Sequence, residues 1–373
     1  MPDRIAAKFV LPLGEICLEM RTAIRIRIPE PVVSCMPNAN LDPQRSPPQD
    51  SRLAAWPSVI LCIPTCRRPA GLRNLLENVA NLVYGGDLSV IVVDNDPQRC
   101  QGCLTVANIS GCFSRPIECE VESNRGHTFA YNRAFLLACR SIRKPEYVAV
   151  LDDDEFPAPH WLEHMIQAAR RFGADIVGGP VFPVYAKKDH WLTKTGLYMP
   201  PALQSGIVPM IFGAGSMLIR TSVLAEYLTE PFPNEYAFTG GSDLDFFRRC
   251  RSDGRRFAWA GEAHVYETIP SSRLALSWLL RRAFRVGTDL TRVDRKYCPG
   301  LQHAIIRWAK GLGLLLYGLS SLPLSGLRGR CFVAKSLYTA ARGSGRLAAE
   351  FNWLYREYAE EIPTSSKSRS NNE

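Results

Sequence analysis

Short apolar runs and amphipathic stretches alternate along the middle of the chain. Runs rich in β-branched residues and bounded by Pro or Asp predict buried strands. Stretches with apolar residues every three or four positions predict helices between them. The predicted strands span residues 58–66, 88–96, 147–155 and 174–184. The predicted helices span residues 67–82, 128–142 and 159–173.

This alternation indicates an α/β fold. We expect a Rossmann-like, mainly parallel sheet with helices on both of its faces. After about residue 185 the pattern changes. A strand and the start of a helix are predicted in 210–224, a helix after a glycine turn in 238–254, and a basic amphipathic helix in 277–287.

Composition is that of a globular protein with an excess of basic residues. The 373 residues are 46% hydrophobic and carry a formal charge of +9, which suits one large domain or two smaller ones. The segment from Pro29 to Pro57 is rich in Pro, Asn, Ser and Asp, which predicts a linker or disorder. The expected organisation is a disordered or linker extension (1–57), an α/β domain (58–290), a basic helical region (291–360) and a disordered tail (361–373).

Positive charge is concentrated towards the C-terminal end. Between Arg273 and Arg346 the chain has fourteen Lys or Arg against two acids, a local balance of +12. Such a segment predicts an anionic partner: lipid headgroups, phosphates or nucleic acid. The stretch from Gly311 to Leu327 carries no charge over 17 residues, which is short for a membrane span. It fits a helix lying in the membrane interface or, equally well, a buried core helix.

Two sets of cysteines have different contexts. One set lies in apolar or helical stretches, as buried free thiols in a reducing compartment do; it comprises Cys62, Cys66, Cys139 and Cys250. The other set is clustered and comprises Cys100, Cys103, Cys112 and Cys119. Its CQGC element is compatible with half of a zinc site, but no second CxxC pair follows, so a cysteine-rich loop is the simpler interpretation.

Acidic residues follow two of the predicted strands. Asp94 and Asp96 end the second strand, and residues 152–155 (DDDE) end the third. Because ligands bind at the carboxyl ends of parallel strands, both clusters should lie along one functional edge. A solvated loop is the alternative for the acid run, although a rigid strand fixes its position. No GxGxxG or GxxxxGK[ST] follows the first strand, which argues against dinucleotide-dependent oxidoreductases and P-loop enzymes.

A divalent cation explains why four carboxylates would end a buried strand. Mn²⁺ and Mg²⁺ prefer oxygen ligands, and Mg²⁺ is usually held by one or two carboxylates plus substrate phosphates. Asp152 and Asp154, spaced D-x-D, are the candidate ligands. A metal there would bridge the protein and a diphosphate.

Five ordered motifs resemble a known family. They read VILCIPTCRRP, VIVVDNDP, SNRGHTFAYNRA, VAVLDDDEFP and FTGGSDLDFFRR. Together they resemble family-2-type glycosyltransferases with the GT-A fold, over roughly Ser58 to Gly287. Variant details such as GGPVFP and WLLRRAFRVG look most like bacterial exopolysaccharide glucosyltransferases of the succinoglycan type.

This resemblance implies a nucleotide-sugar site at the acidic edge. The nucleotide would be held by Pro64, Thr65, Arg67 and Asp94, with Asp96 nearby. The D-x-D acids would handle ribose and metal, and Asp153 would assist. Tyr131 stands where the family often has arginine, in the element that also contains Asn132, a further candidate nucleotide contact.

The motif GGSDLD implies the catalytic base. Asp243 aligns best, and Asp245 is the second candidate. A carboxylate here would take the proton of the acceptor hydroxyl as that hydroxyl attacks the anomeric carbon, which gives single displacement with inversion. A helix N-cap at Ser242 or Asp243 is compatible with that role.

Four further residues are candidates for binding. Arg281, Arg282 and Arg285 lie at helical spacing and would contact the diphosphate or an acidic lipid-linked acceptor; a solvated basic face is an equal alternative. His264, in EAHVYE, is a candidate third metal ligand, although such a histidine is more often structural.

Two rival classes stay open. His160, Glu163 and His164 match the HxxEH pattern of a zinc peptidase. A non-enzymatic module that binds nucleic acid or anionic lipid would explain the basic segment but not the acidic edge.

The favoured function is metal-dependent, inverting glycosyl transfer. The resemblance implies a UDP-sugar donor, glucose as the sugar, and a lipid-linked oligosaccharide acceptor in exopolysaccharide or other cell-surface polysaccharide biosynthesis. The basic C-terminal region would hold the enzyme at the cytoplasmic face of the bacterial inner membrane, as a peripheral or monotopic protein. No nucleic-acid partner is expected.

Overall fold

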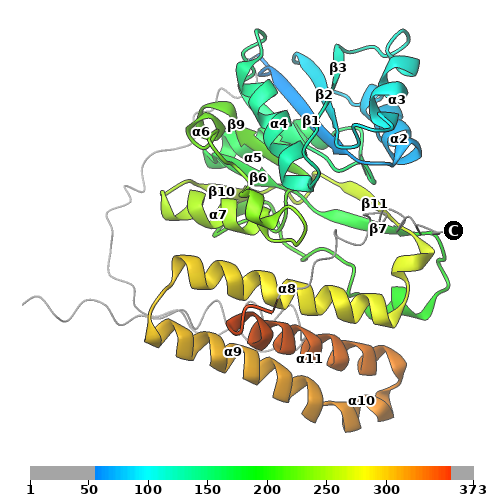
Figure 1. The fold of residues 1–373 in the computed structure, drawn as a ribbon. Coiled ribbons are helices and arrows are strands. Elements are labelled where there is room, and N and C mark those ends of the chain that lie inside the picture. The colour runs from blue at the N-terminus through cyan, green and yellow to red at the C-terminus, as the bar shows by residue number, and fades with distance from the viewer. Residues whose placement is uncertain (1–54, 354–373) are drawn as a thin grey trace, which may run out of the picture. The chain divides into compact units, whose positions relative to one another are not determined.

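The computed structural model describes residues 55–353, so most of the expected N-terminal extension and the whole expected tail lie outside the described residues. An eight-stranded sheet runs in the order β3-β2-β1-β4-β9-β6-β10-β8 (Figure 1). Its strands are β1 (Val59–Thr65), β2 (Leu88–Asp94), β3 (Ile117–Val121), β4 (Tyr147–Val150), β6 (Ile176–Gly178), β8 (Gly206–Val208), β9 (Met217–Arg220) and β10 (Phe257–Trp259). β1 to β4 pair in parallel, while β9 runs antiparallel between β4 and β6. The expected α/β class with a mainly parallel sheet is confirmed.

The central strand β1 is buried on both faces. Leu61 and Ile63 face one core, and Ile60 and Cys62 face the other. The first core is shared with α2 (Pro69–Ala80) and α5 (Trp161–Phe172), and the second with α4 (His127–Arg140), α6 (Thr221–Glu226) and α7 (Ser242–Ser252). A strand covered on both faces must be apolar at every position, which is why its sequence does not alternate.

The predicted strand at 174–184 proves to be two strands. Gly179 and Pro180 separate β6 from β7 (Val181–Tyr185), and β7 leaves the main sheet. It joins β5 (Glu155–Pro157) and β11 (Val265–Ile269) in a three-stranded sheet of order β5-β11-β7. The strands and helices outside every predicted segment include α3 (Gln101–Ile109), β3, β8, β10 and β11.

Four helices follow the sheets: α8 (Leu276–Tyr297), α9 (Leu301–Ser320), α10 (Leu322–Arg328) and α11 (Arg330–Glu350). The expected domain boundary at 290 falls inside α8, which is continuous. Figure 1 shows α8 between the sheet-bearing part and the layer of α9 and α11. No helix within 55–353 is long and apolar enough to cross a membrane.

Glycines let these helices approach closely. A Cβ at Gly345 of α11 would overlap the Phe284 carbonyl oxygen of α8, and one at Gly318 of α9 would lie 2.5 Å from the Ala340 backbone nitrogen of α11. Backbones therefore meet where side chains would normally intervene. The interpretation of Gly311–Leu327 as a buried core helix is wrong, because most of its large apolar side chains are exposed.

Gly345→Ala should destabilise the protein by about 1–3 kcal/mol, because the new methyl group has no room against α8. The matched control is Gly313→Ala in α9, where a Cβ would meet nothing within 4 Å. That change should be neutral or stabilise by up to about 1 kcal/mol through helix propensity. Urea unfolding of the two variants measures the difference. Equal effects would contradict the close-packing assignment.

Candidate active site

The acidic edge lies at the point in the sheet where the strand order reverses. Moving out from β1, the chain continues to β2 on one side and to β4 on the other, so a crevice forms at their carboxyl ends. Thr65 at the end of β1 pairs in register with Asp94 at the end of β2. The acid run follows directly after β4. The two acidic clusters therefore share one edge, as the sequence predicted.

Asp153 ties the two central strand ends together. Its buried carboxylate accepts hydrogen bonds from the Thr65 hydroxyl (2.8 Å), the Cys66 backbone N–H (3.4 Å) and the Arg68 guanidinium (3.0 Å). These bonds occupy both of its oxygens. The assisting role at the ligand proposed for Asp153 is thus replaced by a positioning role.

Asp154 is partly exposed at the crevice. Its side chain is 21% exposed and lies 2.8 Å from Arg68 and 3.5 Å from Arg273. Arg273 also pairs with Glu267 of β11 at 2.7 Å, which brings that carboxylate beside Asp154. Glu267 was missed in the sequence, although it stands in the same EAHVYE element as the histidine that was singled out.

Asp152 is held from two sides. The Tyr131 hydroxyl donates to its carboxylate, and its backbone N–H donates to the Glu155 carboxylate at 2.9 Å. Burial, assisted by the charge of Asp154, raises the pKa of Asp152 to about 7. Burial also raises the pKa of Glu155 well above its ordinary value, and Asp152 adds to that shift. Tyr131, which replaces the family's arginine, therefore contacts an acid of the D-x-D element.

Asp94 is turned towards its own chain. Its fully buried carboxylate accepts from the backbone N–H groups of Asp96 (3.1 Å), Gly102 (2.6 Å) and Cys103 (3.3 Å). The last two open α3, where a negative charge is favourable. The structure thus uses Asp94 to cap α3, and its nucleotide contact stays a prediction.

Arg67 and Asp96 form an ion pair of 2.7 Å beside this cap. The hydrogen bond from Arg67 lowers the pKa of Asp96. Arg67 lies in the left-handed region with φ of 57°, a conformation that costs free energy in a non-glycine residue and often occurs at functional sites. Pro64 is buried within β1.

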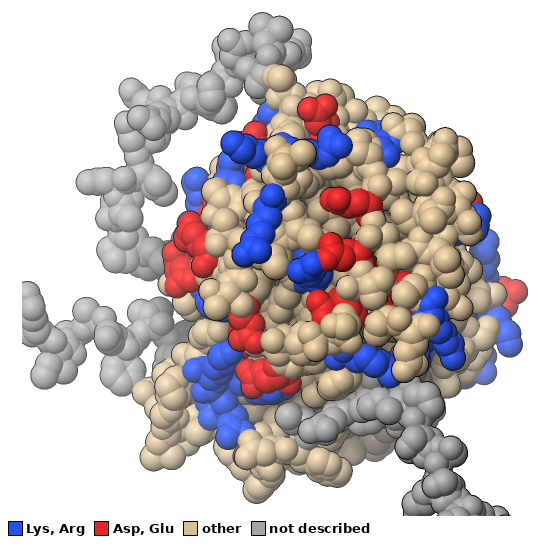
Figure 2. Space-filling model, turned by 45° about the horizontal axis from the view of Figure 1, so that its top comes forward, with Lys and Arg blue, Asp and Glu red and all other residues tan. Residues whose placement is uncertain are grey.

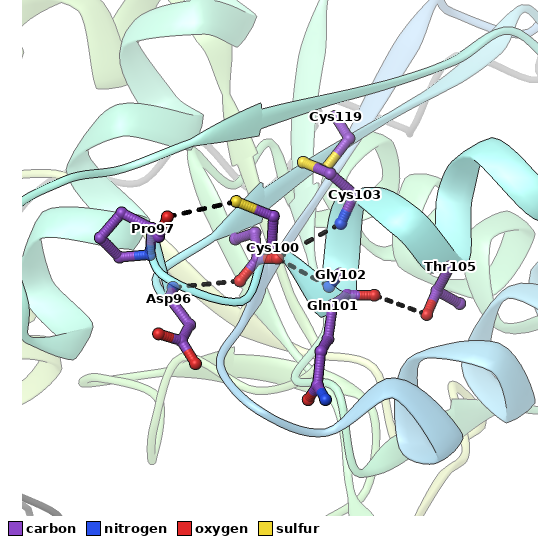
Figure 3. Close-up of a disulfide and its surroundings, with 9 residues drawn as sticks. Asp96, Pro97, Cys100, Gln101, Gly102, Cys103, Thr105 and Cys119 are labelled. Carbon is purple, nitrogen blue, oxygen red and sulfur yellow. Dashed lines mark hydrogen bonds between the residues drawn. A yellow bond between two sulfur atoms is a disulfide. The ribbon is translucent and has the colours of Figure 1, made fainter.

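Two of the clustered cysteines form a disulfide, so the less favoured zinc interpretation of CQGC is not supported. Cys103 in α3 is bonded to Cys119 in β3, with their Cα atoms 5.3 Å apart (Figure 3). Cys100 and Cys112 are free thiols. Within 55–353, no group of three or more His, Cys, Asp or Glu is arranged to hold a metal by itself.

Asp243 lies in the first turn of α7, whose start is firmly anchored. His127 Nε2 lies 3.1 Å from the Ser242 hydroxyl, and His127 Nδ1 lies 3.1 Å from the Ala237 carbonyl oxygen. Burial lowers the pKa of His127 to about 4, so its imidazole is neutral. Burial raises the pKa of Asp243, and the nearby Arg285 opposes that shift. A partly buried carboxylate with a raised pKa is a suitable proton acceptor.

Asp245 is enclosed by hydrogen-bond donors. Its fully buried carboxylate accepts hydrogen bonds from Tyr236 (3.0 Å), Lys296 (2.7 Å) and Tyr297 (3.0 Å). These partners fasten α7 to α8. These contacts give Asp245 a structural role and favour Asp243 as the base, a choice that stays a prediction.

A cavity of about 300 Å³ lies next to the acidic edge, where Glu267 lines it; Asp243 and the acids at 152–155 stand behind its wall. Gly213 and Gly215 form part of its wall. A Cβ at Gly213 would lie 3.6 Å from the Asp243 carboxylate, and a Cβ at Gly215 would overlap that of Glu155. Glu267 and Arg282 also line this cavity.

The three arginines of α8 that were candidates for binding lie in different surroundings. Arg281 is exposed, while Arg285 lies against Gly240, just before α7. Of the three arginines, only Arg282 is among the residues that line the cavity.

Two predicted ligands have other roles. The Asn132 amide exchanges hydrogen bonds of 2.8 and 2.9 Å with the backbone of Phe232. His264 packs its ring against Phe182 and lies opposite Ala158. It is three residues before Glu267, about 10 Å along the strand, and so is displaced from the acidic edge.

The rival sequence interpretations are not supported. Glu163 pairs with His160 at 2.7 Å on the exposed start of α5. Figure 2 shows acidic and basic side chains interspersed over the face drawn.

Comparison with known proteins gives consistent matches. The model of Glycosyl transferase family 2 matches residues 60–228. The succinoglycan biosynthesis protein ExoM of Rhizobium meliloti (strain 1021) is 31% identical over 247 residues, covering 64% of this chain and 76% of that protein. The uncharacterized protein y4gI of Sinorhizobium fredii (strain NBRC 101917 / NGR234) is 25% identical over 240 residues, covering 59% of this chain and 26% of that protein.

A solved structure shows the same fold. The mannosyltransferase PcManGT from Pyrobaculum calidifontis, in complex with GDP-Man and Mn²⁺, matches with a TM-score of 0.53 and 18% identity. The match covers 80% of this chain and 88% of that one.

The raised pKa of Asp152 predicts a pH-dependent stability. Between about pH 4 and pH 7 the folded state binds more protons than the unfolded state, so stability should rise as the pH falls through this window. Asp152→Asn should therefore stabilise the protein at about pH 8, by on the order of 2 kcal/mol, and much less at about pH 5. Asp154→Asn is the control, since it removes a carboxylate paired with two arginines and should give no such gain. Thermal unfolding of both variants at both pH values measures the difference. An Asp152→Asn variant that is less stable than the parent at about pH 8 would contradict the raised pKa of Asp152.

Proposed function

This chain belongs to glycosyl transferase family 2, and on that premise we propose that it is a metal-dependent, inverting transferase that uses a nucleoside-diphosphate sugar. The observation that carries the proposal is the cavity whose glycine wall adjoins Asp243 at one point and the acid cluster at another. A sugar held there lies between a proton acceptor and the groups that receive a diphosphate. This is the arrangement that single displacement requires.

On the donor side, the acidic edge suits a hard cation. Asp154 is partly exposed and Glu267 lies beside it, so oxygen ligands are available at the crevice. Asp154 and Asp152 would hold the metal, which would neutralise charge on the departing diphosphate when bound. Arg68 and Arg273, already paired with Asp154, supply positive charge at the same place.

On the acceptor side, Asp243 is the proposed base. It would accept the proton of the attacking hydroxyl, while His127 and Ser242 hold the start of α7 in place. Because the base and the acid cluster adjoin the cavity at different points, attack and departure occur on opposite sides of the anomeric carbon. Inversion follows from this separation.

The natural substrates are proposed from similarity. The likeness to a succinoglycan biosynthesis protein supports a role in exopolysaccharide synthesis. The motif resemblance to succinoglycan-type glucosyltransferases is the ground for proposing a UDP-sugar donor, glucose as the sugar and a lipid-linked saccharide acceptor. The basic C-terminal region supports a location at the cytoplasmic face of the bacterial inner membrane, as a peripheral or monotopic protein.

Donor use and metal dependence are tested together. UDP release is measured over a panel of nucleotide sugars with Mn²⁺ or Mg²⁺. We expect turnover with a UDP-hexose, loss of turnover with a chelator, and recovery when excess metal is restored. Asp154→Ala should abolish release, whereas His160→Ala should leave it unchanged. Full activity in the chelator would overturn the metal dependence, and the opposite pattern in the two variants would overturn the site.

The assignment of the base is tested by paired isosteric variants. Asp243→Asn should lower kcat by about 10²–10⁴-fold with little change in stability, because it removes the proton acceptor. Asp245→Asn should lower the free energy of unfolding by about 1–3 kcal/mol yet keep most of kcat while folded, because it weakens a buried hydrogen-bond network. Single-turnover rates and urea unfolding measure the two effects. A reversed pattern would assign the base to Asp245.

A further inference from the structure

The helix α9 has its large apolar side chains on the outside. Its exposed residues recur every three or four positions and so share one face: Leu301, Ile305, Trp308, Leu312, Leu316 and Leu319. The next helix continues this surface with Leu324 and Leu327, the latter 86% exposed. We call these eight residues the outer apolar face.

The inner side of α9 contacts α11 through two glycines and through Arg307, which pairs with Glu350 at 2.7 Å. Gly311 and Gly318 are buried against α11, next to Leu347 and Ala340 respectively. A surface helix in water normally shows the reverse arrangement, with large apolar residues inward and polar residues outward. Small residues at helix contacts and large apolar residues outside are typical of helices in lipid.

Hydroxyl groups reinforce the inner contact. The Ser336 hydroxyl of α11 lies 2.8 Å from the Ser321 hydroxyl and 2.7 Å from the Ser325 hydroxyl. Hydroxyl hydrogen bonds between helices are another feature of helix packing in membranes. Thus α9 and α10 are held to α11 without using their large apolar side chains.

Charge around the outer apolar face selects the partner. The chain has no Asp or Glu between Asp294 and Glu350. Arg328 ends α10 next to Leu327 and is exposed, and the exposed Arg330 opens α11 directly afterwards. Apolar side chains bordered by cations, with no acid among them, complement an anionic lipid surface.

We propose that the outer apolar face of α9 and α10 lies in the interface of an anionic lipid bilayer, parallel to its plane. This rests on the proposed membrane location and deepens it by naming the contact surface. Neither helix is a membrane span, so the attachment is monotopic. α8 and α11, which contribute Leu279, Arg282 and Tyr338 to the cavity lining, join that surface to the catalytic part. The saccharide cavity is therefore held close to the membrane from which a lipid-linked acceptor would arrive.

Vesicle co-sedimentation of the full chain tests this proposal. The probes are vesicles of mixed phosphatidylglycerol and phosphatidylcholine, and vesicles of phosphatidylcholine alone. We expect binding to the anionic vesicles that weakens with salt. Leu312→Glu combined with Leu316→Glu should weaken that binding by about tenfold or more, because two leucine side chains would no longer enter the lipid. Ile142→Glu is the matched control: this side chain is 96% exposed, lies between α4 and β4, and should leave binding unchanged.

Two further readouts separate the possible failures. Circular dichroism should show the double variant folded, since both leucines are exposed. UDP release without lipid should be the same in the double variant and the parent, so a loss of vesicle binding alone leaves the proposed transferase function intact. Equal vesicle binding by parent and double variant, or a parent that binds no anionic vesicles, would overturn the proposal. A parent dimer that the double variant dissociates, without vesicle binding, would assign the face to a second copy instead.

Discussion

The site depends on one buried carboxylate, that of Asp153. Its oxygens receive hydrogen bonds from Thr65, Cys66 and Arg68, so the loop after β1 and the loop after β4 are fixed relative to each other. These loops belong to adjacent parallel strands, and without a shared partner they could separate at the crevice. With Asp153 turned inward, its neighbour Asp154 is placed at the crevice. The D-x-D spacing thus works because the middle acid is structural.

This arrangement makes the charged forms of Asp152 and Glu155 unfavourable. Both carboxyls are held where burial and mutual repulsion favour the neutral form, so both pKa values rise. Natural proteins keep such strain mainly where a function needs it. A divalent cation bound here would relieve the repulsion between these carboxylates. The stability of the empty site and its affinity for a cation are therefore opposed.

Much of the fold is readable from the sequence, for identifiable reasons. β1, β2 and β4 are buried on both faces, and such strands must be continuous apolar runs. The division between β6 and β7 was missed because GGP interrupts an apolar run without changing its composition. α3 and β3 were missed because few of their side chains are buried. Those two elements depend on the Asp94 cap and on the bond between Cys103 and Cys119, which no periodicity reveals.

The site itself was predictable only in part. The strand ends that carry it were evident, because the carboxyl ends of parallel strands collect ligands. Which acid turns inward depends on loop geometry, so Asp94, Asp153 and Asp245 could not be separated from their neighbours by residue type. Glu267 reaches the edge through the pairing of β11 with β5, a contact between distant segments.

The continuous helix α8 contacts both the cavity and the C-terminal helices. Its Arg282 lines the cavity. Its Lys296 donates a hydrogen bond to Asp245 and so fastens α8 to α7, the helix that carries Asp243. Its opposite side meets α11 so closely that Gly345 has no room for a side chain. A movement of the C-terminal helices therefore cannot leave the cavity unchanged. If the outer apolar face contacts a bilayer as proposed, α8 is the element through which that contact would reach the cavity wall.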